Sequence, residues 1–347
     1  MLEGFIRRVR DINLRASRYM RTVMPDDNLA VRTRLAVMGG CPVEELIITR
    51  NTTESLDTVI GGFHWNAGDE AVMAQQDYGA MLDMFGLQAK RHGIVNRVVS
   101  LPMDPRSDDE IVRLYESAIT PKTRLLMICH MVNITGQLLP VAKVAAMAHG
   151  HGVQVMVDGA HTFGQLEFAI PDLGADYFAS SLHKWLGSPL GSGILWVRRD
   201  HIPELWPTFA ELGIPDTDIR RLNHTGTQPV HTILAINDAL DFHESIGIAR
   251  KEARLRWLQR YWTDKVRVHP RIHLNTPSDP ARTGAIANVG IRGLAPAALG
   301  DALFDRYKIW TVAIDGAGVR GVRVTPHLFT STAELDALVV ALKEIAA

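Results

Sequence analysis

The sequence has 347 residues, of which 46% are hydrophobic and 22% are charged, so it carries enough apolar material for one large domain or two smaller ones. Its 37 basic and 38 acidic residues leave a net charge of −1, which argues against a nucleic-acid or anionic-membrane partner. The two cysteines, Cys41 and Cys129, have no metal-type spacing. Neither a disulfide framework nor a metal site is therefore expected, and a cytoplasmic compartment fits.

No apolar run in the sequence reaches the ~18 residues of a membrane span, so no membrane partner is expected. The arginine pair Arg7–Arg8 is followed by no apolar stretch, which argues against a secretory or twin-arginine signal. The first predicted element is helical and covers residues 3–23. Its apolar side consists of Phe5, Val9, Ile12 and Leu14.

From about residue 46, short apolar runs alternate with helical stretches. Buried strands are predicted at 46–48, 71–74, 97–99, 125–128, 153–157 and 193–197. Helices are predicted between most of them, at 53–63, 78–92, 107–117 and 140–149. This alternation indicates a mostly parallel sheet covered by helices on both faces.

The character of the chain changes after residue 205. The segment 201–228 is rich in Pro, Gly and Thr and is interpreted as a connecting region. A long helical segment is predicted at 229–266, and strands and helices of an α+β unit follow it to the end of the chain. The predicted fold is therefore α/β, with an N-terminal helical segment at 1–22, a large α/β domain at 23–228 and a smaller C-terminal α+β domain at 229–347.

Two strand ends carry groups that suit pyridoxal 5′-phosphate (PLP) chemistry. Asp158 follows the strand at 153–157, and Ser181, His183 and Lys184 follow a strand region near 176–180. PLP chemistry needs a lysine that forms an imine with the cofactor and a carboxylate that keeps the pyridine nitrogen protonated. A turn-forming Asp beside an unrelated surface Lys is the alternative, and the joint occurrence at two strand ends disfavours it.

These motifs, with those below, resemble the class V aminotransferases, a branch of the fold type I PLP-dependent transferases. Within that class the chain most resembles the isopenicillin-N-epimerase-like proteins. The resemblance implies a large domain with a mostly parallel seven-stranded sheet sandwiched by helices. It implies that Lys184 holds the cofactor, that Asp158 meets the pyridine nitrogen, and that His161 lies near the ring hydroxyl. Ser181 and His183 match phosphate-binding positions.

The resemblance also implies roles for residues outside this cluster. Thr52 and Thr53 lie between the first strand and a helix, where they match phosphate-binding positions; a plain helix cap is the alternative. Tyr78 matches an aromatic residue stacked on the ring, and Asn133 one near the ring and the substrate. Further along the chain, Arg323 matches the arginine that binds the substrate carboxylate, and Gly226 and Thr227 match a pair that reaches the phosphate of a partner subunit. A homodimer with shared active sites is therefore expected.

The sequence leaves the reaction open. Cysteine desulfurases carry a nucleophilic cysteine shortly before the carboxylate-binding arginine, and residues 310–320 contain none. The other reactions of this class begin with removal of the α-proton of an amino-acid substrate. The outcome is then epimerisation or racemisation, transamination, or β-elimination, as in a C–S lyase. For epimerisation, Tyr78 is a candidate for the second proton donor, opposite Lys184.

Two functions from other classes are alternatives. A nicotinamide-dependent dehydrogenase needs a glycine-rich loop after the first strand, and Arg50-Asn51-Thr52-Thr53-Glu54 has no glycine. A non-catalytic binding module with the PLP fold is the second. Family members usually begin with a further segment that reaches over the active site, whereas this sequence begins at the first helix. Either the start is trimmed, or the substrate site is built differently.

Overall fold

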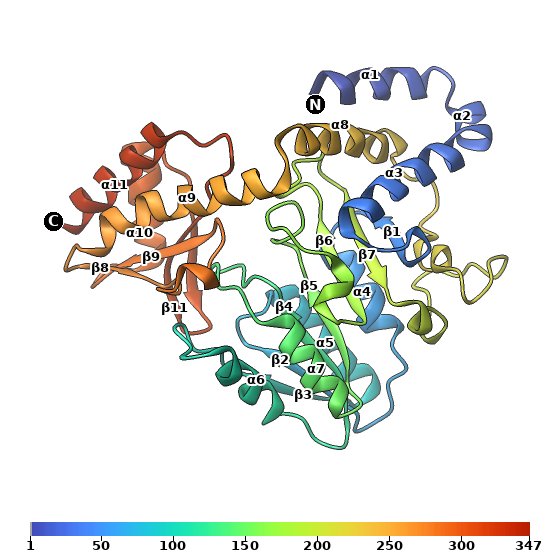
Figure 1. Ribbon diagram of the computed structural model, residues 1–347, viewed down its shortest axis with the longest axis horizontal. Helices are drawn as coiled ribbons and strands as arrows, with labels where there is room; N and C mark the ends of the chain where they lie inside the picture. The colour runs from blue at the N-terminus through green and yellow to red at the C-terminus, as the bar shows by residue number, and fades with distance from the viewer. Residues whose placement is uncertain (1) are drawn as a thin grey trace.

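The computed structural model describes residues 2–347, which form two β-sheets. A seven-stranded sheet is built from residues 46–197, and a four-stranded sheet from residues beyond 271. Figure 1 shows the two sheets side by side, with helix α9 (Ile248–Arg267) running from one towards the other.

The seven-stranded sheet is mostly parallel, as predicted. Its order is β1-β7-β6-β5-β4-β2-β3, and only β7 runs antiparallel to its neighbours. Its strands are β1 (Leu46–Thr49), β2 (Glu70–Ala74), β3 (Val95–Val99), β4 (Thr123–Cys129), β5 (Gln154–Asp158), β6 (Tyr177–Ser181) and β7 (Gly193–Val197). The carboxyl ends of the parallel strands share one edge of the sheet, where ligands bind in such folds.

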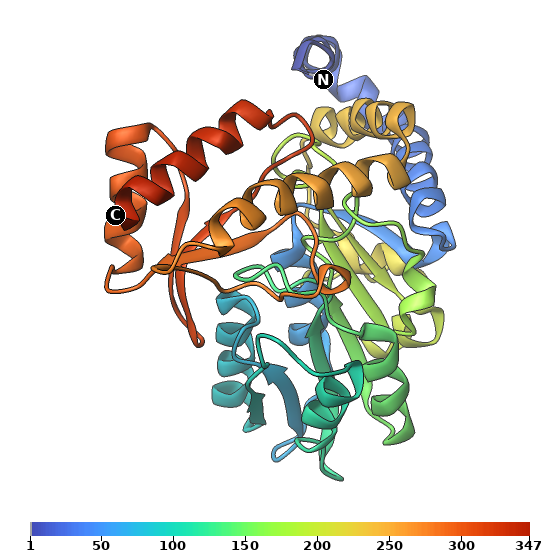
Figure 2. The same cartoon turned by 60° about the vertical axis from the view of Figure 1, so that its left-hand side comes forward.

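Helices cover both faces of this sheet, because its central strands are apolar on both sides. Ile47 packs on one face with α4 (Thr52–Gly62) and α5 (Gly79–His92), whereas Leu46 and Ile48 pack on the other face. That second face is covered by α3 (Met24–Gly39), α6 (Asp108–Glu116), α7 (Val141–Gly150) and α8 (Val230–Ile246). Figure 2 shows the sheet between these two groups of helices.

The single helical element expected at 3–23 consists of two helices, α1 (Leu2–Asn13) and α2 (Ala16–Thr22). Ile12 and Tyr19 pack with Val230 of α8, one from each helix. The chain must turn between them so that both side chains reach α8. The turn leaves Leu14 87% exposed, so its predicted place on the apolar side was wrong.

The helical segment predicted at 229–266 is likewise divided. Helices α8 and α9 meet at Gly247, whose φ of +83° is readily adopted only by glycine. Helix α8 packs against α1 and α3, and α9 packs against α11 (Thr332–Ala346). The predicted domain limits at residues 22/23 and 228/229 stay predictions.

The four-stranded sheet is antiparallel in the order β10-β11-β9-β8. Its strands are β8 (Ile272–Leu274), β9 (Ala287–Ile291), β10 (Val312–Gly316) and β11 (Val319–Val324), and α9, α10 (Pro296–Tyr307) and α11 share its apolar core. This arrangement agrees with the predicted smaller α+β unit. Arg323 of β11 lies at the end of the large sheet where the parallel strands terminate.

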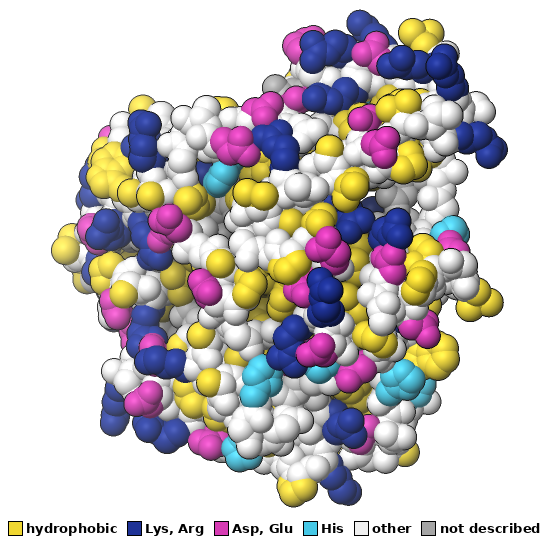
Figure 3. All heavy atoms as spheres, turned by 45° about the vertical axis from the view of Figure 1, so that its right-hand side comes forward, with side chains coloured by type: hydrophobic (Ala, Val, Ile, Leu, Met, Phe, Trp, Pro, Cys, Tyr) yellow, Lys and Arg dark blue, Asp and Glu magenta, His cyan; other side chains and the backbone are white. Residues whose placement is uncertain are grey.

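The surface carries both signs of charge. In the view of Figure 3, basic side chains gather over the N-terminal helices at the top, and acidic and basic side chains are interspersed elsewhere. Among residues 2–347, no helix is both long and apolar enough to cross a membrane.

Candidate active site

A cavity of about 380 Å³ lies at the carboxyl ends of the parallel strands. It brings together side chains from the loops after β1, β2, β4, β5 and β6, together with one residue of β11. Ten of the twelve predicted site residues line it: Thr52, Thr53, Tyr78, Asn133, Asp158, His161, Ser181, His183, Lys184 and Arg323. Residues predicted from separate motifs therefore share one cavity, while their individual roles stay predictions.

Lys184 lies in the turn after β6, and its Nζ atom is 3.3 Å from Nε2 of His161. Burial lowers the pKa of Lys184, and the nearby Asp158 carboxylate opposes this effect. A lowered pKa increases the fraction of neutral amine, which is the form that attacks a carbonyl carbon.

Asp158 is the last residue of β5 and is 5% exposed. Its Oδ1 atom accepts a hydrogen bond from the backbone N–H of Ala160 at 2.9 Å, which holds the carboxyl group in place. Burial raises the pKa of Asp158, while the Ala160 N–H and Lys184 act in the opposite direction. A carboxylate held in this way can form a charged hydrogen bond with a protonated ring nitrogen.

The N-terminus of helix α4 forms another wall of the cavity. Asn51 caps the helix by accepting a hydrogen bond from the Glu54 N–H at 2.9 Å. The backbone N–H of Thr52 donates to the Ser181 hydroxyl at 3.0 Å, and the two hydroxyl oxygens are 2.7 Å apart. The positive end of the helix dipole and the hydroxyl groups beside it suit an anionic group such as phosphate.

Arg323 reaches the cavity from the other sheet and connects it to the loop after β4. Its Nη1 atom donates to the Asn133 carbonyl at 3.3 Å. Two buried polar atoms, Nε of Arg323 and Oδ1 of Asn133, have no hydrogen-bond partner among residues 2–347. Because buried polar atoms are nearly always paired, these two atoms are placed to meet a ligand.

The side chains of Tyr78 and His183 lie on the rim of the same cavity. Tyr78 precedes α5 and is 48% exposed. Nδ1 of His183 donates to the Ser192 carbonyl at 3.1 Å, which anchors the ring to the glycine-rich segment before β7.

Gly226 and Thr227 do not line this cavity. Thr227 lines a smaller hollow of about 100 Å³ together with Arg50 and Glu54, and Gly226 has a φ of +76° in the turn before α8. Their predicted contact with the phosphate of a partner subunit stays a prediction.

Several lining residues were not predicted from the sequence. Asn51 and Met81 belong to the cavity, each within three residues of a predicted one, so local spacing pointed to them. Trp185 and His327 were missed as well; with Thr325 they line an adjoining hollow of about 250 Å³ that shares His161, Lys184 and Arg323 with the main cavity. His327 reaches this hollow only because the C-terminal unit packs against the end of the large sheet.

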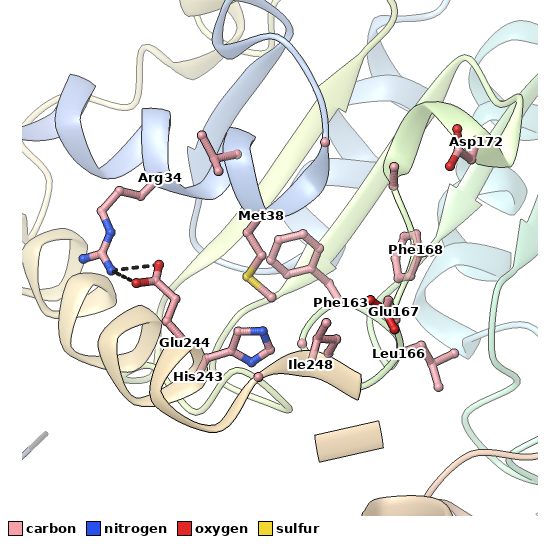
Figure 4. A pocket seen from close by; sticks show the side chains of 15 residues that line it. Arg34, Met38, Phe163, Leu166, Glu167, Phe168, Asp172, His243, Glu244 and Ile248 are labelled. Atoms are coloured by element: carbon pink, nitrogen blue, oxygen red, sulfur yellow. Dashed lines mark hydrogen bonds and ion pairs between the residues drawn. The ribbon is translucent and has the colours of Figure 1, made fainter. Parts of the chain in front are cut away.

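A hollow of about 720 Å³ lies apart from these residues, between α3, the segment 163–172 and the junction of α8 and α9. Figure 4 shows Met38, Phe163 and Ile248 around it and the Arg34–Glu244 ion pair at one side. None of the predicted site residues lines it.

The residues of the main cavity fit PLP. An amine, a buried carboxylate and a hydroxyl-lined helix N-terminus meet in one space, as required by the carbonyl, the ring nitrogen and the phosphate of the cofactor. The unpaired Asn133 Oδ1 and Arg323 Nε atoms offer further polar contacts.

Comparisons with known proteins agree with this chemistry. A model of the family described as aminotransferase class-V matches residues 26–325. The chain is 32% identical to the isopenicillin N epimerase of Amycolatopsis lactamdurans over 333 residues, which cover 90% of this chain and 84% of that protein. It is 29% identical to a cysteine desulfurase of Haloferax volcanii over 258 residues, 70% of this chain and 59% of that protein.

Solved structures support the same fold. The complex between a cystine C–S lyase and its reaction product cysteine persulfide superposes with a TM-score of 0.87 at 23% identity, covering 98% of this chain and 93% of that chain. At this identity the likeness concerns the fold alone, and it confirms the predicted fold type I architecture.

Proposed function

The chain belongs to the class-V aminotransferase family, whose cofactor is pyridoxal phosphate. We propose that it removes the α-proton of an amino acid and inverts the configuration of the α-carbon. Epimerisation or racemisation is the favoured reaction, because the 32% identity to an isopenicillin N epimerase extends over 90% of the chain. The observation that carries the proposal is the cavity in which Lys184, Asp158 and Arg323 meet.

In this proposal the residues divide between cofactor and substrate. Thr52, Thr53, Ser181 and His183 would hold the phosphate, Asp158 the ring nitrogen, and Tyr78 one face of the ring. When bound, the cofactor supplies an electron-accepting ring that makes the α-proton of an amino acid acidic. Arg323 would hold the substrate carboxylate through two parallel hydrogen bonds, a geometry that its planar guanidinium favours.

Lys184 would take the α-proton on its Nζ atom from one side of the substrate. Inversion needs a proton from the other side, and we assign this role to the Tyr78 hydroxyl, which lines the same cavity. The adjoining hollow lined by Thr325 and His327 would accommodate the substrate side chain, because it opens at Lys184 and Arg323. The substrate would thus be an amino acid or a compound that carries a free α-amino acid group.

A desulfurase reaction receives no support from the cysteines. The turn between β10 and β11 consists of Ala317 and Gly318, and the sequence has only Cys41 and Cys129. Cys129 is 1% exposed, and burial raises the pKa of its thiol, so it is a poor nucleophile.

A homodimer with shared sites is part of the proposal. A hollow that shares Asn51 and Thr53 with the active-site cavity is bordered by Trp206 and Phe209, which are 62% and 53% exposed. Large exposed apolar side chains beside an active site suit a surface covered by another protein chain. A partner subunit that brings its own 226–227 segment to this surface would complete the phosphate site. The cytoplasmic compartment stays a prediction.

The test is deuterium exchange at the α-carbon. The PLP-loaded protein is incubated in D₂O with a panel of enantiopure amino acids and with isopenicillin N, and the products are analysed by mass spectrometry and chiral chromatography. We expect deuterium incorporation with inversion and without a 2-oxo acid for at least one compound. Lys184→Ala should abolish exchange, whereas the exposed Lys143→Ala should not. A 2-oxo acid as the main product would refute epimerisation, and full exchange in Lys184→Ala would refute the site assignment.

A further inference from the structure

The two ring nitrogens of His161 face two different neighbours. Nε2 is 3.3 Å from Nζ of Lys184, and Nδ1 is 3.1 Å from Nε1 of Trp185. His161 is 9% exposed and Trp185 is 4% exposed, so water competes little for either contact. Trp185 follows Lys184 directly in the sequence, and their side chains reach the same imidazole ring from different directions.

The contact with Trp185 determines where the imidazole proton lies. An indole N–H can donate a hydrogen bond and cannot accept one. Nδ1 of His161 must therefore be the acceptor and carry no proton. A neutral imidazole has a single N–H, which then lies on Nε2 and points towards Lys184. Burial lowers the pKa of His161 well below its ordinary value, so the ring is neutral near pH 7.

We propose that Trp185 is a positioning residue that holds His161 in the Nε2–H form, so that an N–H donor always faces Nζ of Lys184. A neutral amine has a lone pair that accepts this hydrogen bond, whereas an ammonium group has none. The arrangement therefore favours the neutral amine that the proposed function requires of Lys184. The inference rests on that function for its purpose, although the contacts stand without it.

The position of Trp185 is held from two sides. Its indole ring stacks on His327 with 5.5 Å between ring centroids and an interplanar angle of 9°. Lys251 donates a hydrogen bond to the Trp185 carbonyl from helix α9. His161 is held as well, because Nε2 of Gln165 donates to its carbonyl at 2.5 Å. The indole–imidazole contact is thus fixed by residues of helix α9, of the segment after β5 and of the segment after β11.

Other groups also act on Lys184 and must be considered in any pH experiment. Asp158 favours its ammonium form, and Arg323 favours its neutral form. The remaining titratable groups that line the cavity and its adjoining hollow or act on Lys184 are Tyr78, Cys129, His161, His183 and His327. A variant that changes only the Trp185 N–H leaves all of these groups in place.

The test compares Trp185→Phe with the wild type. Phe keeps an aromatic ring for the stack on His327 and removes the N–H donor. Trp262→Phe is the matched control, because Trp262 is also fully buried and its Nε1 atom has no partner among residues 2–347. Nitrogen-15 NMR of histidine-labelled protein without cofactor reports the protonation of each ring nitrogen, and His161→Gln assigns the His161 signals.

We expect wild-type His161 to show a protonated Nε2 and an unprotonated Nδ1 from about pH 5 to pH 8, the range in which an ordinary histidine titrates. In Trp185→Phe the signals should move towards a mixture of the two neutral forms. The pH at which added PLP forms its visible band on Lys184 should also move upwards in this variant, and Trp262→Phe should change neither readout.

A wild-type His161 protonated on Nδ1 would overturn the proposal, and so would unchanged signals in Trp185→Phe. If Trp185→Phe does not fold, the wild-type spectrum alone still decides the form of the ring. None of these readouts uses an amino-acid substrate, so failure of the proposed epimerase reaction would leave them unaffected.

Discussion

Asp77 shows how a single residue next to the active site depends on its surroundings. It lies between β2 and Tyr78, is 5% exposed, and accepts a hydrogen bond from the Ala74 N–H at 2.8 Å. Burial raises the pKa of Asp77 to about 7, and the Ala74 hydrogen bond opposes this effect. Near neutral pH this carboxyl group is therefore partly protonated, unlike an exposed aspartate.

This raised pKa predicts an unusual pH dependence of stability. The unfolded pKa of Asp is about 3.9, so between that pH and about 7 the folded state holds a proton that the unfolded state has lost. The contribution of Asp77 to the free energy of unfolding is thus present below pH 4 and is lost as the pH rises towards 7. Each pKa unit corresponds to about 1.4 kcal/mol.

We expect Asp77→Asn to remove this loss, because the amide keeps an acceptor for the Ala74 N–H and does not titrate. Urea unfolding at several pH values should show the variant gaining roughly 1–4 kcal/mol on the wild type between about pH 4 and pH 7. The exposed Asp264→Asn serves as the control. Parallel pH curves for Asp77→Asn and the wild type would contradict the assignment.

At the scale of elements, the proposed phosphate end of the site depends on close contact between β7 and α4. Gly193 begins β7, and a Cβ atom there would lie 2.7 Å from the Asn51 Cα and 2.8 Å from the Asn51 nitrogen. Asn51 caps α4, and the backbone N–H of the next residue, Thr52, donates a hydrogen bond to the Ser181 hydroxyl. Glycine at position 193 therefore allows the helix N-terminus to reach the strand end.

Gly193→Ala should push Asn51 away from β7 and disturb both the cap and the Thr52–Ser181 contact. We expect a loss of roughly 1–3 kcal/mol of stability, typical of overpacking, and a weaker affinity for PLP. Gly86 lies inside α5, and nothing lies within 4 Å of a Cβ atom there, so Gly86→Ala should instead stabilise by roughly 0.5–1 kcal/mol. Thermal unfolding and PLP titration measure both effects; unchanged PLP affinity in Gly193→Ala would argue against the proposed phosphate site.

At the scale of the whole molecule, the proposed homodimer predicts complementation between two inactive variants. Lys184→Ala removes the proposed cofactor lysine, and Thr227→Asp places a negative charge where the partner's phosphate would bind. In a mixed dimer with shared sites, one site contains both the native Lys184 and the native Thr227. When equal amounts of the two variants exchange subunits at random, half of the dimers are mixed. About a quarter of all active sites should then be intact.

The measurement is α-proton exchange after the two variants are unfolded and refolded together. Refolding each variant alone is the control and should give no activity. If the mixture stays inactive although mixed dimers are detected by mass spectrometry, the 226–227 segment does not belong to a shared site. An active Thr227→Asp homodimer would lead to the same conclusion.

Much of the fold and the Asp158–Lys184 pair followed from local patterns, and the other site residues from the resemblance of their motifs to a family. Apolar runs alternating with helical stretches predicted the parallel sheet, because strands buried on both faces need continuous apolar sequence. Asp158 and Lys184 were recognisable because each lies at or after a strand end, and the ends of parallel strands share one edge. These features depend on residues close together in the chain, so the sequence alone determined them.

Other features were decided by the tertiary structure. Arg323 contacts Asn133 across 190 residues of sequence, and the break at Gly247 directs α8 and α9 to different sheets. The Trp185–His161 contact depends on how two side chains are oriented, which the strand and helix periods do not encode. Contacts of this kind arise only when the elements of the chain pack together, because packing rather than local spacing sets which distant atoms meet.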